Sequence, residues 1–247
     1  MRLENSTWPQ VEKYLQEKQL IIVPVGSTEQ HGPTGIFGTD YVTAQKIAEA
    51  VGDRHAVMVA PPLCFGMAEH HLAFPGTMSL RPSTYVNVIV DLIRSLRQNG
   101  FEKILFVNGH GGNIAPMTTA FSESKSLEDQ TALMLINWWH LPEVREYEDQ
   151  HFGDQNGFHA TVGEVSVTMY TNAEAFHTIP KENFTVKKMN HPWPLSGKEF
   201  RKHFPDGRMA SNPGLASEGH GRKIFDIAVD SICRKVTEIQ QGHYPFK

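Results

Sequence analysis

The sequence predicts an α/β protein with three layers, in which helices cover both faces of a mostly parallel central sheet. Short apolar runs alternate with amphipathic segments from residue 20 to about residue 140. Apolar runs without internal alternation are typical of parallel strands, which are buried on both faces. Amphipathic segments between such strands indicate the covering helices. No repeat or low-complexity tract interrupts the chain, and we expect one domain over residues 1–247.

Four apolar runs are predicted to form the strands. They cover residues 20–25, 56–60, 103–107 and 132–136. The second run is stopped by two prolines at 61 and 62, and the first and third run directly into polar, glycine-rich segments.

Amphipathic periodicity predicts the helices. The first begins near Thr39 and ends before Gly52, and the next begins at Ser83 and ends at Gly100. Further helices are expected over about 114–123, from about Thr161, and at the C-terminal end. The last of these has one apolar face, built from Phe225, Ala228, Ile232, Val236 and Ile239. The polar segment 141–157 is interpreted as an active-site loop or lid, and segment 181–213 shows no clear periodicity.

Composition and charge limit the classes of partner. The 247 residues are 40% hydrophobic and 20% charged, with a net charge of −4, which is typical of a globular protein and argues against nucleic acid or an anionic membrane. No apolar stretch reaches the ~20 residues that span a bilayer, and no signal-peptide core follows the first residues. Cys64 and Cys233 are isolated, as in a reducing compartment. We therefore expect a cytoplasmic protein.

Imidazole and carboxylate side chains follow two of the predicted strands. Glu29 and His31 come after the first strand, and residues two apart in an extended segment project to the same side. Asp40 begins the next helix, and His110 lies in the glycine-rich turn after the third strand. Ligands of open α/β sheets bind beyond the carboxyl ends of the strands. Since imidazole and carboxylate suit zinc, manganese or iron, we interpret these four residues as metal ligands. The alternative is a set of capping carboxylates and a turn histidine.

Two further segments admit two interpretations each. The turn at 108–113, N-G-H-G-G-N, could hold a phosphate on backbone N–H groups, although it lacks the G-x-G-x-x-G spacing and a Walker lysine. A phosphate on the substrate stays open. Glu164 falls in the first turn of a predicted helix and His159 in the loop before it, so both could face the same pocket. In the alternative interpretation, Glu164 only interacts favourably with the dipole at the start of the helix.

Four of these segments together resemble the creatininase (creatinine amidohydrolase) family. The first is 26–33, G-S-T-E-Q-H-G-P, with Thr39-Asp40, and the second is 71–80, H-x-x-F-P-G-T-x-S-L. The third is the turn at 108–113, and the fourth is His159-Ala160 with Glu164 and Ser166. Residues 212–217 give a weaker fifth match. The matches are collinear over roughly residues 20 to 220.

The resemblance implies a three-layer α/β/α fold, assembly as a homohexamer and a binuclear metal centre. It implies two divalent ions, zinc in the first place and manganese or iron as alternatives. The implied ligands are Glu29, His31, Asp40 and His110, with Asp40 as the bridge. Glu164 matches a site glutamate that could complete the ligand shell, and His159 matches a histidine for proton transfer.

The third segment departs from the pattern of creatinine-hydrolysing members. They carry a metal-binding glutamate where this chain has Gly112 and a tyrosine where it has Gly111. Either Glu164 supplies the missing ligand or one metal is bound weakly. Both differences argue against creatinine as the substrate. His70 and Ala68 also differ from many members, which affects substrate contacts rather than the metals.

These observations predict a metal-dependent amidohydrolase that cleaves a non-peptide C–N bond, in a cyclic amide or a formamide, with a metal-activated water. His159 is expected to give a proton to the leaving nitrogen. Substrate contacts are expected from His70, His71, Trp138 and Trp139, with a polar turn and core packing as the alternatives. Two other functions stay open. One is the trimming of a modified peptide, and the other is a non-catalytic module that binds a metal or a phosphorylated metabolite.

Overall fold

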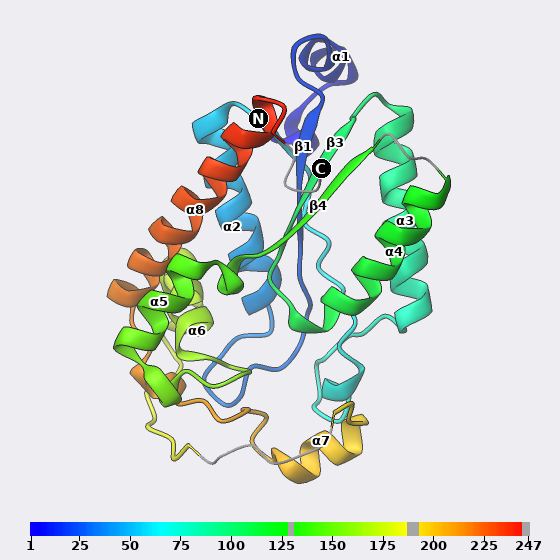
Figure 1. Cartoon of the computed structure of the whole chain (residues 1–247). Helices are drawn as coiled ribbons and strands as arrows, with labels where there is room; N and C mark the ends of the chain where they lie inside the picture. Colours follow the sequence, from blue (N-terminus) through cyan, green and yellow to red (C-terminus); the bar gives the residue numbers. More distant parts are fainter. Residues whose placement is uncertain (128–130, 187–192, 244–247) are drawn as a thin grey trace.

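The computed structural model describes residues 1–127, 131–186 and 193–243, and its centre is a sheet of four parallel strands (Figure 1). The strand order is β2-β1-β3-β4. In the shared register Ile21 pairs with Ile104, and Ile104 pairs with Leu133. The strands are β1 (Leu20–Val25), β2 (Met58–Val59), β3 (Lys103–Asn108) and β4 (Ala132–Asn137).

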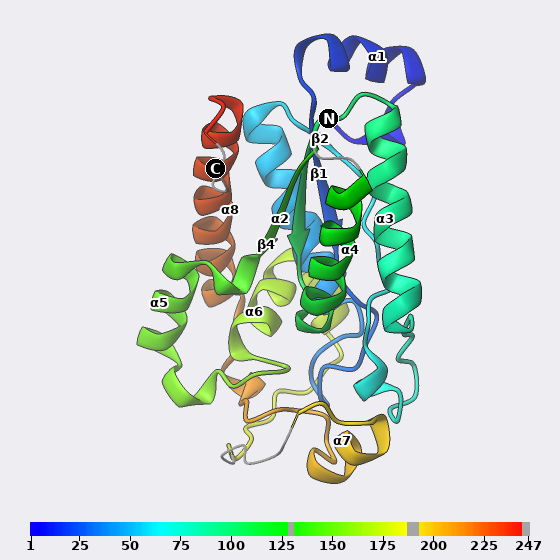
Figure 2. The same cartoon turned by 45° about the vertical axis from the view of Figure 1, so that its right-hand side comes forward.

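Alternate residues of each strand enter two separate hydrophobic cores, because successive side chains of a strand point to opposite faces. Ile22 and Leu105 enter one core, and Ile21 and Ile104 enter the other. Two sets of helices close these cores on opposite sides of the sheet, so the predicted three-layer fold is confirmed (Figures 1 and 2). The first core is closed by α2 (Thr39–His55), α5 (Pro142–His151), α6 (Val162–Thr171) and α8 (Glu218–Gln240), and the second by α3 (Pro82–Gln98) and α4 (Ile114–Leu127).

The strand order places a switch of direction between β1 and β3. The chain moves from β1 outward to β2 and then returns to the other side of β1 as β3. In open α/β sheets, ligands bind at the carboxyl ends of the strands on either side of such a switch. The segments that leave β1 and β3 at this edge carry three of the predicted metal ligands, Glu29, His31 and His110.

The second predicted strand is shorter than residues 56–60. Helix α2 continues to His55, and Ala56 ends it in the left-handed conformation, with φ of 49°. Only Met58 and Val59 then pair with β1, opposite Ile21 and Ile22. Ala56 and Val57 are as apolar as the two paired residues, so hydrophobicity alone does not mark where the strand begins.

The interpretation of residues 141–157 as a loop or lid is wrong. Most of the segment forms α5, followed by a 3-10 turn at Gly153–Gln155. Helix α5 packs against α8 and buries Val144 and Glu148, which lie four residues apart on one face. Apart from Pro142, only Val144 and Tyr147 of its ten residues are apolar, and this polar composition is what suggested a loop.

Two shorter helices lie where no element was predicted, α1 (Trp8–Glu17) and α7 (Gly197–His203). Helix α7 belongs to the segment 181–213, of which residues 187–192 are outside the described part. Cys64 and Cys233 are both free thiols. Among the described residues, no helix has both the length and the apolar character needed to cross a bilayer.

Candidate metal centre

Asp40 enters the centre because two glycines let the start of α2 approach the ends of β1 and β3. A Cβ atom at Gly26 would lie 2.4 Å from the backbone nitrogen of Tyr41, and one at Gly109 would lie 2.0 Å from the carbonyl oxygen of Asp40. These obstacles are backbone atoms, which cannot rotate away. Glycine at both positions therefore determines where the first turn of α2, and with it the Asp40 carboxylate, lies.

The four predicted ligands meet at this point. His31 Nε2 lies 3.0 Å from Asp40 Oδ1. His110 Nδ1 lies 3.2 Å from Asp40 Oδ2 and 3.2 Å from Glu29 Oε2. All four residues are at most 4% exposed, so water does not screen their charges. The structure thus brings together side chains that are up to 81 residues apart in the chain.

Backbone carbonyls orient both histidines. His110 Nε2 donates to Met67 O at 2.9 Å, and His31 Nδ1 donates to Glu29 O at 3.1 Å. A carbonyl oxygen only accepts, so in the neutral rings the other nitrogen carries the lone pair and faces the carboxylates. Such hydrogen bonds from the outer nitrogen are typical of metal-ligating histidines.

The polar atoms at the centre of the site lack hydrogen-bond partners. Both carboxylate oxygens of Glu29, Oδ2 of Asp40 and Nε2 of His31 are buried and accept or donate no hydrogen bond within the described structure. Buried polar atoms are normally satisfied, and orphaned ones indicate a function. Carboxylates and imidazoles that converge in this way fit a divalent cation such as zinc or manganese.

Protons balance the carboxylates when no metal is bound. Burial alone would lower the pKa of His31, but Asp40, Glu164 and Glu29 outweigh burial and raise it to about 10. In the same way Glu29 and Asp40 hold the pKa of His110 well above its ordinary value against the effect of burial. A metal requires neutral imidazole, so metal and protons compete for these sites.

Two groups of three residues place their ligand atoms within 4.8 Å of one another and share Asp40. We call Glu29, Asp40 and His110 the first metal group, and His31, Asp40 and Glu164 the second metal group. The shared carboxylate is in the position that a bridging ligand requires. This arrangement is compatible with two ions per chain.

Glu164 serves α6 and the second metal group together. Its Oε1 accepts from the backbone nitrogen of Thr161 at 2.5 Å, while its own backbone nitrogen donates to Thr161 Oγ1 at 3.1 Å. This capping box satisfies two amides at the start of α6 and uses one carboxylate oxygen of Glu164, so the other is not needed for capping. Burial is the main cause that raises the pKa of Glu164 to about 7. The capping and ligand interpretations of this residue are therefore compatible.

Gly112 has no room for the glutamate that creatinine-hydrolysing members carry there. A Cβ atom at Gly112 would lie 2.3 Å from Met67 O and 2.4 Å from His110 Nε2, the two atoms of the hydrogen bond that orients His110. A side chain at 112 would break that hydrogen bond. The departure seen in the sequence thus belongs to a local packing in which Glu164 is the available carboxylate.

His159 lies against the metal groups. Its Nδ1 is 3.7 Å from Glu29 Oε1, and its Nε2 donates to the backbone oxygen of Gln30 at 2.8 Å. Burial, and then the charge of His31, lower the pKa of His159 to about 3, so the ring is neutral with a free lone pair on Nδ1. His159 also forms a third possible ligand set with Glu29 and His31.

His70 and His71 lie on a 3-10 turn, Glu69–His71, beside the same carboxylate. His71 Nε2 is 3.4 Å from Glu29 Oε1, and the two rings lie 4.1 Å apart. Burial is the largest cause that lowers the pKa of His70 to about 4 and the pKa of His71 well below its ordinary value. Both rings are neutral, and both border the cavity described next.

A cavity of about 400 Å³ opens onto Glu29, His110 and His159. Aromatic side chains stand at its mouth, where Phe158 is 71% exposed and Trp193 is 57% exposed. Among the described residues, no lysine or arginine belongs to the lining. The apolar part of the wall was not found from the sequence, because it comes from segments without periodicity. It consists of Met67, Ala115, Phe158, Trp193, Leu195, Phe204 and Met209.

Trp138 and Trp139 lie elsewhere than predicted. Trp138 is 1% exposed inside the first hydrophobic core, and Trp139 packs against that core. Neither belongs to the lining of the 400 Å³ cavity. Both residues follow the end of β4 and belong to the core that α5 helps to close, which corresponds to the core-packing alternative. The structure gives no support to their predicted contact with the substrate.

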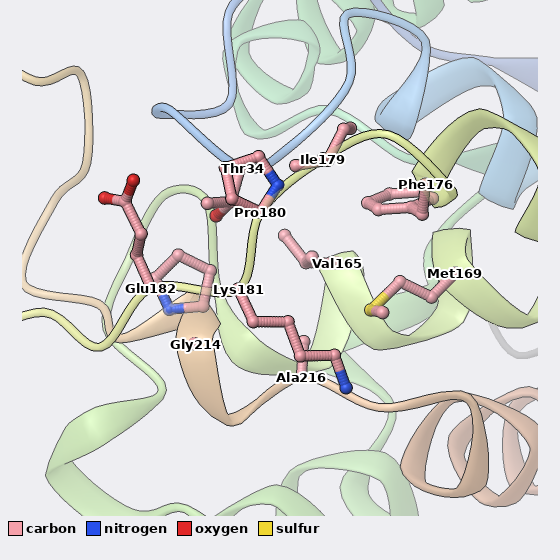
Figure 3. Close-up of a pocket in the computed structure, with 11 residues that line it drawn as sticks. Thr34, Val165, Met169, Phe176, Ile179, Pro180, Lys181, Glu182, Gly214 and Ala216 are labelled. Atoms are coloured by element: carbon pink, nitrogen blue, oxygen red, sulfur yellow. The ribbon is translucent and has the colours of Figure 1, made fainter.

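A second, smaller cavity lies beside α6. It holds about 50 Å³ and is lined by Val165, Met169, Phe176, Ile179 and Lys181, among others (Figure 3). None of the residues of either metal group lines it. Its size suits one or two water molecules rather than a substrate.

Comparisons with known proteins agree with this geometry. The family described as "Creatininase: Creatinine amidohydrolase" matches residues 4–236. The mycofactocin precursor peptide peptidase of Mycobacterium tuberculosis H37Rv is 36% identical over 230 residues, which cover 87% of this chain and 84% of that protein. The 3-dehydro-scyllo-inosose hydrolase of Thermotoga maritima is 30% identical over 138 residues, 56% of this chain and 44% of that protein.

Solved structures show the same fold. A manganese form of creatininase has a TM-score of 0.83 at 20% identity and covers 96% of this chain and 97% of its own. A mutant creatininase of Zn-Zn type has a TM-score of 0.79 at 19% identity with the same two coverages. The match over nearly the whole chain, together with the converging carboxylates and imidazoles, shows that the chain belongs to the creatininase family of metal-dependent amidohydrolases.

Proposed function

We propose that the protein hydrolyses an amide C–N bond in a small molecule, a cyclic amide or a formamide, with two divalent metal ions. The observation that carries the proposal is the set of buried ligand atoms without hydrogen-bond partners on Glu29, His31 and Asp40. Zinc is the first candidate, and manganese or iron suits the same ligands. The proposed ligands are Glu29, His31, Asp40, His110 and Glu164.

When bound, the ions supply a water activated at neutral pH and polarise the carbonyl oxygen of the substrate. His159 then moves the proton. Its neutral Nδ1 accepts a proton from the attacking water and gives it to the leaving nitrogen, while Nε2 stays bound to Gln30 O. His71 Nε2 lies 3.4 Å from Glu29 Oε1 and borders that carboxylate. His70 and the aromatic residues at the mouth bind the organic part of the substrate.

A second candidate is the hydrolysis of an amide bond near the end of a peptide. It is favoured by the 36% identity to a mycofactocin precursor peptide peptidase over most of both chains. The cavity also opens between exposed Phe158 and Trp193, so a longer substrate can extend outward.

Metal content tests the first half of the proposal. Protein purified without chelator or affinity-tag metal is analysed by plasma mass spectrometry, and we expect close to two transition-metal ions per chain. A value near zero that added zinc or manganese does not raise would reject the binuclear hydrolase.

Turnover tests the second half. The metal-loaded enzyme is assayed on a panel of cyclic amides, formamides and short peptides, and release of a new amine identifies the substrate class. His159→Gln should lower turnover about 10²- to 10⁴-fold, the usual contribution of a general acid–base group, and leave the metal content unchanged. Loss of metal in this variant would instead make His159 a ligand.

A further inference from the structure

Gln30 lies between two predicted metal ligands in sequence and contacts three distant segments in space. It is 5% exposed. Its side-chain nitrogen Nε2 is 2.9 Å from His71 Nδ1 and 2.9 Å from the carbonyl oxygen of Gly207, and its backbone nitrogen donates to Thr77 Oγ1 at 3.2 Å. Its backbone oxygen accepts from His159. The expectations from sequence gave this residue no role.

Two backbone groups fix the orientation of the Gln30 amide. Oε1 accepts from the backbone nitrogen of Gly32 at 2.8 Å, and Nε2 donates to Gly207 O. A flipped amide would place its oxygen against the Gly207 carbonyl and its nitrogen against the Gly32 N–H. The direction of the amide therefore does not depend on either histidine.

The remaining amide hydrogen determines the proton position on His71. One hydrogen of Nε2 is used by Gly207 O, so the second points to His71 Nδ1, which must accept it. The proton of the neutral ring is then on Nε2, 3.4 Å from Glu29 Oε1. His71 thus presents a donor, rather than a lone pair, to a carboxylate of the first metal group.

The backbone oxygen of Gln30 determines which ring nitrogen of His159 carries the proton. The side-chain nitrogen also approaches His159 Nε2 at 3.0 Å, but both of its hydrogens are already used. His159 Nε2 therefore carries the proton and donates to Gln30 O at 2.8 Å, which leaves Nδ1 free. One residue sets the tautomers of both histidines that flank Glu29.

The loop around Gly207 is shaped to hold this amide. Gly207 has φ of 87°, and a Cβ atom there would lie 1.9 Å from Gln30 Oε1. Any other residue at 207 would displace the amide from its two backbone partners. Gly100 has a similar φ of 98°, but a Cβ atom there meets only Leu15 at 3.6 Å, an ordinary contact.

We propose that Gln30 is a positioning residue that acts through His71, by holding it in the tautomer whose Nε2 proton faces Glu29 Oε1 across 3.4 Å and so favours one orientation of this metal ligand. The proposal rests on the proposed function, because it assigns Glu29 to the metal centre. Outer partners of metal ligands typically contribute about 10- to 100-fold in metal affinity.

A double-mutant cycle on zinc affinity tests the proposal. Zinc dissociation constants are measured by competition with a chromophoric chelator for the full chain and for Gln30→Met, His71→Leu and the double variant. We expect each single change to weaken zinc binding about 10- to 100-fold. The double variant should bind zinc no more weakly than the weaker-binding single variant, because both changes remove the same chain of contacts from Gln30 through His71 to Glu29. Gln45→Met, which removes a hydrogen bond to Glu49 on α2, is the matched control and should bind zinc as the parent does.

Independent, multiplying effects of the two single changes would overturn the proposal, and so would a Gln30→Met variant that binds zinc like Gln45→Met. If Gln30→Met does not fold, Gly207→Ala moves the same amide and Gly100→Ala carries the same backbone strain. Weakened zinc binding in Gly207→Ala alone supports the proposal, and equal effects in the two alanine variants contradict it.

The tautomers can be read without metal or substrate. Long-range proton–nitrogen spectra of the chain labelled with ¹⁵N-histidine should show His71 and His159 protonated on Nε2 and not on Nδ1. A proton on Nδ1 of His71 in the metal-free chain would exclude the Gln30 hydrogen bond. If the tautomers are as stated but the chain takes up no zinc, the proposed function fails and the role of Gln30 in setting the tautomers stands.

Discussion

The two metal groups differ in what holds their ligands. In the first metal group Glu29, Asp40 and His110 come from the ends of β1 and β3 and from the first turn of α2, next to the sheet. The second metal group needs Glu164, which lies at the start of α6 and uses one carboxylate oxygen to cap that helix. The first group is therefore built by the sheet, and the second is completed by a helix terminus.

The two sites of this fold therefore depend on different parts of the structure. His110 and Glu29 keep their positions through the strand register and a hydrogen bond to Met67 O. Glu164 is held instead by the capping box with Thr161 at the start of α6. Only Asp40 belongs to both groups, so changes at these residues should separate the two sites.

The largest effect is expected from Asp40→Ala. The variant removes the shared carboxylate, so both ions should be lost and turnover should vanish. Metal content by plasma mass spectrometry measures the result. Asp53→Ala, on the same helix but paired with Arg2 at the surface, should keep the parent value. Two ions retained by Asp40→Ala would rule out the bridging role.

Glu164→Gln should cost one ion. A glutamine oxygen still accepts from Thr161 N and preserves the cap, while the anionic ligand of the second metal group is lost. Metal content should fall from two ions to one, with the melting temperature little changed. Glu199→Gln is the matched control, because Glu199 forms the same capping box with Ser196 on α7, away from the metal groups. Unchanged metal content in Glu164→Gln would remove this residue from the ligand set.

Gly112→Ala should weaken the first metal group selectively. The added methyl would overlap Met67 O and His110 Nε2, so the hydrogen bond that orients His110 breaks. We expect zinc affinity to fall about 10- to 100-fold, measured by chelator competition. Gly111→Ala meets no atom within 4 Å and should bind zinc normally. Similar affinities for the two variants would show that His110 does not need Met67.

The smallest effect concerns stability near the second metal group. Burial, and then the charge of Glu164, raise the pKa of Glu148 in α5 to about 8 from its ordinary value of 4.5. A raised pKa means that the folded chain favours the protonated acid, so stability is full below the ordinary pKa and falls as pH rises through about 8. Glu148→Gln should therefore gain melting temperature relative to the parent at pH 9 and much less at pH 5.

Glu146→Gln, on the exposed face of the same helix, provides the comparison for that measurement. Its melting temperature should follow the parent at both values of pH. A Glu148→Gln variant whose difference from the parent is the same at pH 5 and pH 9 would show that this carboxyl ionises as easily in the folded chain as in the unfolded one.

Much of the fold could be predicted because its strands and large helices bury continuous apolar faces. β1, β3 and β4 are apolar runs, and α2 and α4 begin at the predicted residues. The helix α5 escaped prediction because most of its ten residues are charged or polar, including the buried Glu148. The second strand was overestimated because Ala56 uses a left-handed conformation that composition does not reveal.

The candidate site divides in the same way. Glu29, His31, Asp40 and His110 were found because they stand at strand ends and a helix start, where local sequence indicates position. The cavity wall and the role of Gln30 depend on contacts between segments far apart in the chain, such as Gln30 with Gly207, 177 residues away. Such contacts follow from the path of an irregular segment, and no periodic pattern encodes that path.

The glycines that flank Asp40 have a consequence for divergence within the family. Because Gly26 and Gly109 are confronted by main-chain atoms, no exchange of neighbouring side chains can relieve a substitution there. The cavity mouth is under no such restriction, since Phe158 and Trp193 project into solvent. Residues at the cavity mouth can therefore be substituted, and substrate preference can change with them. The two glycines that position Asp40 cannot be substituted in the same way.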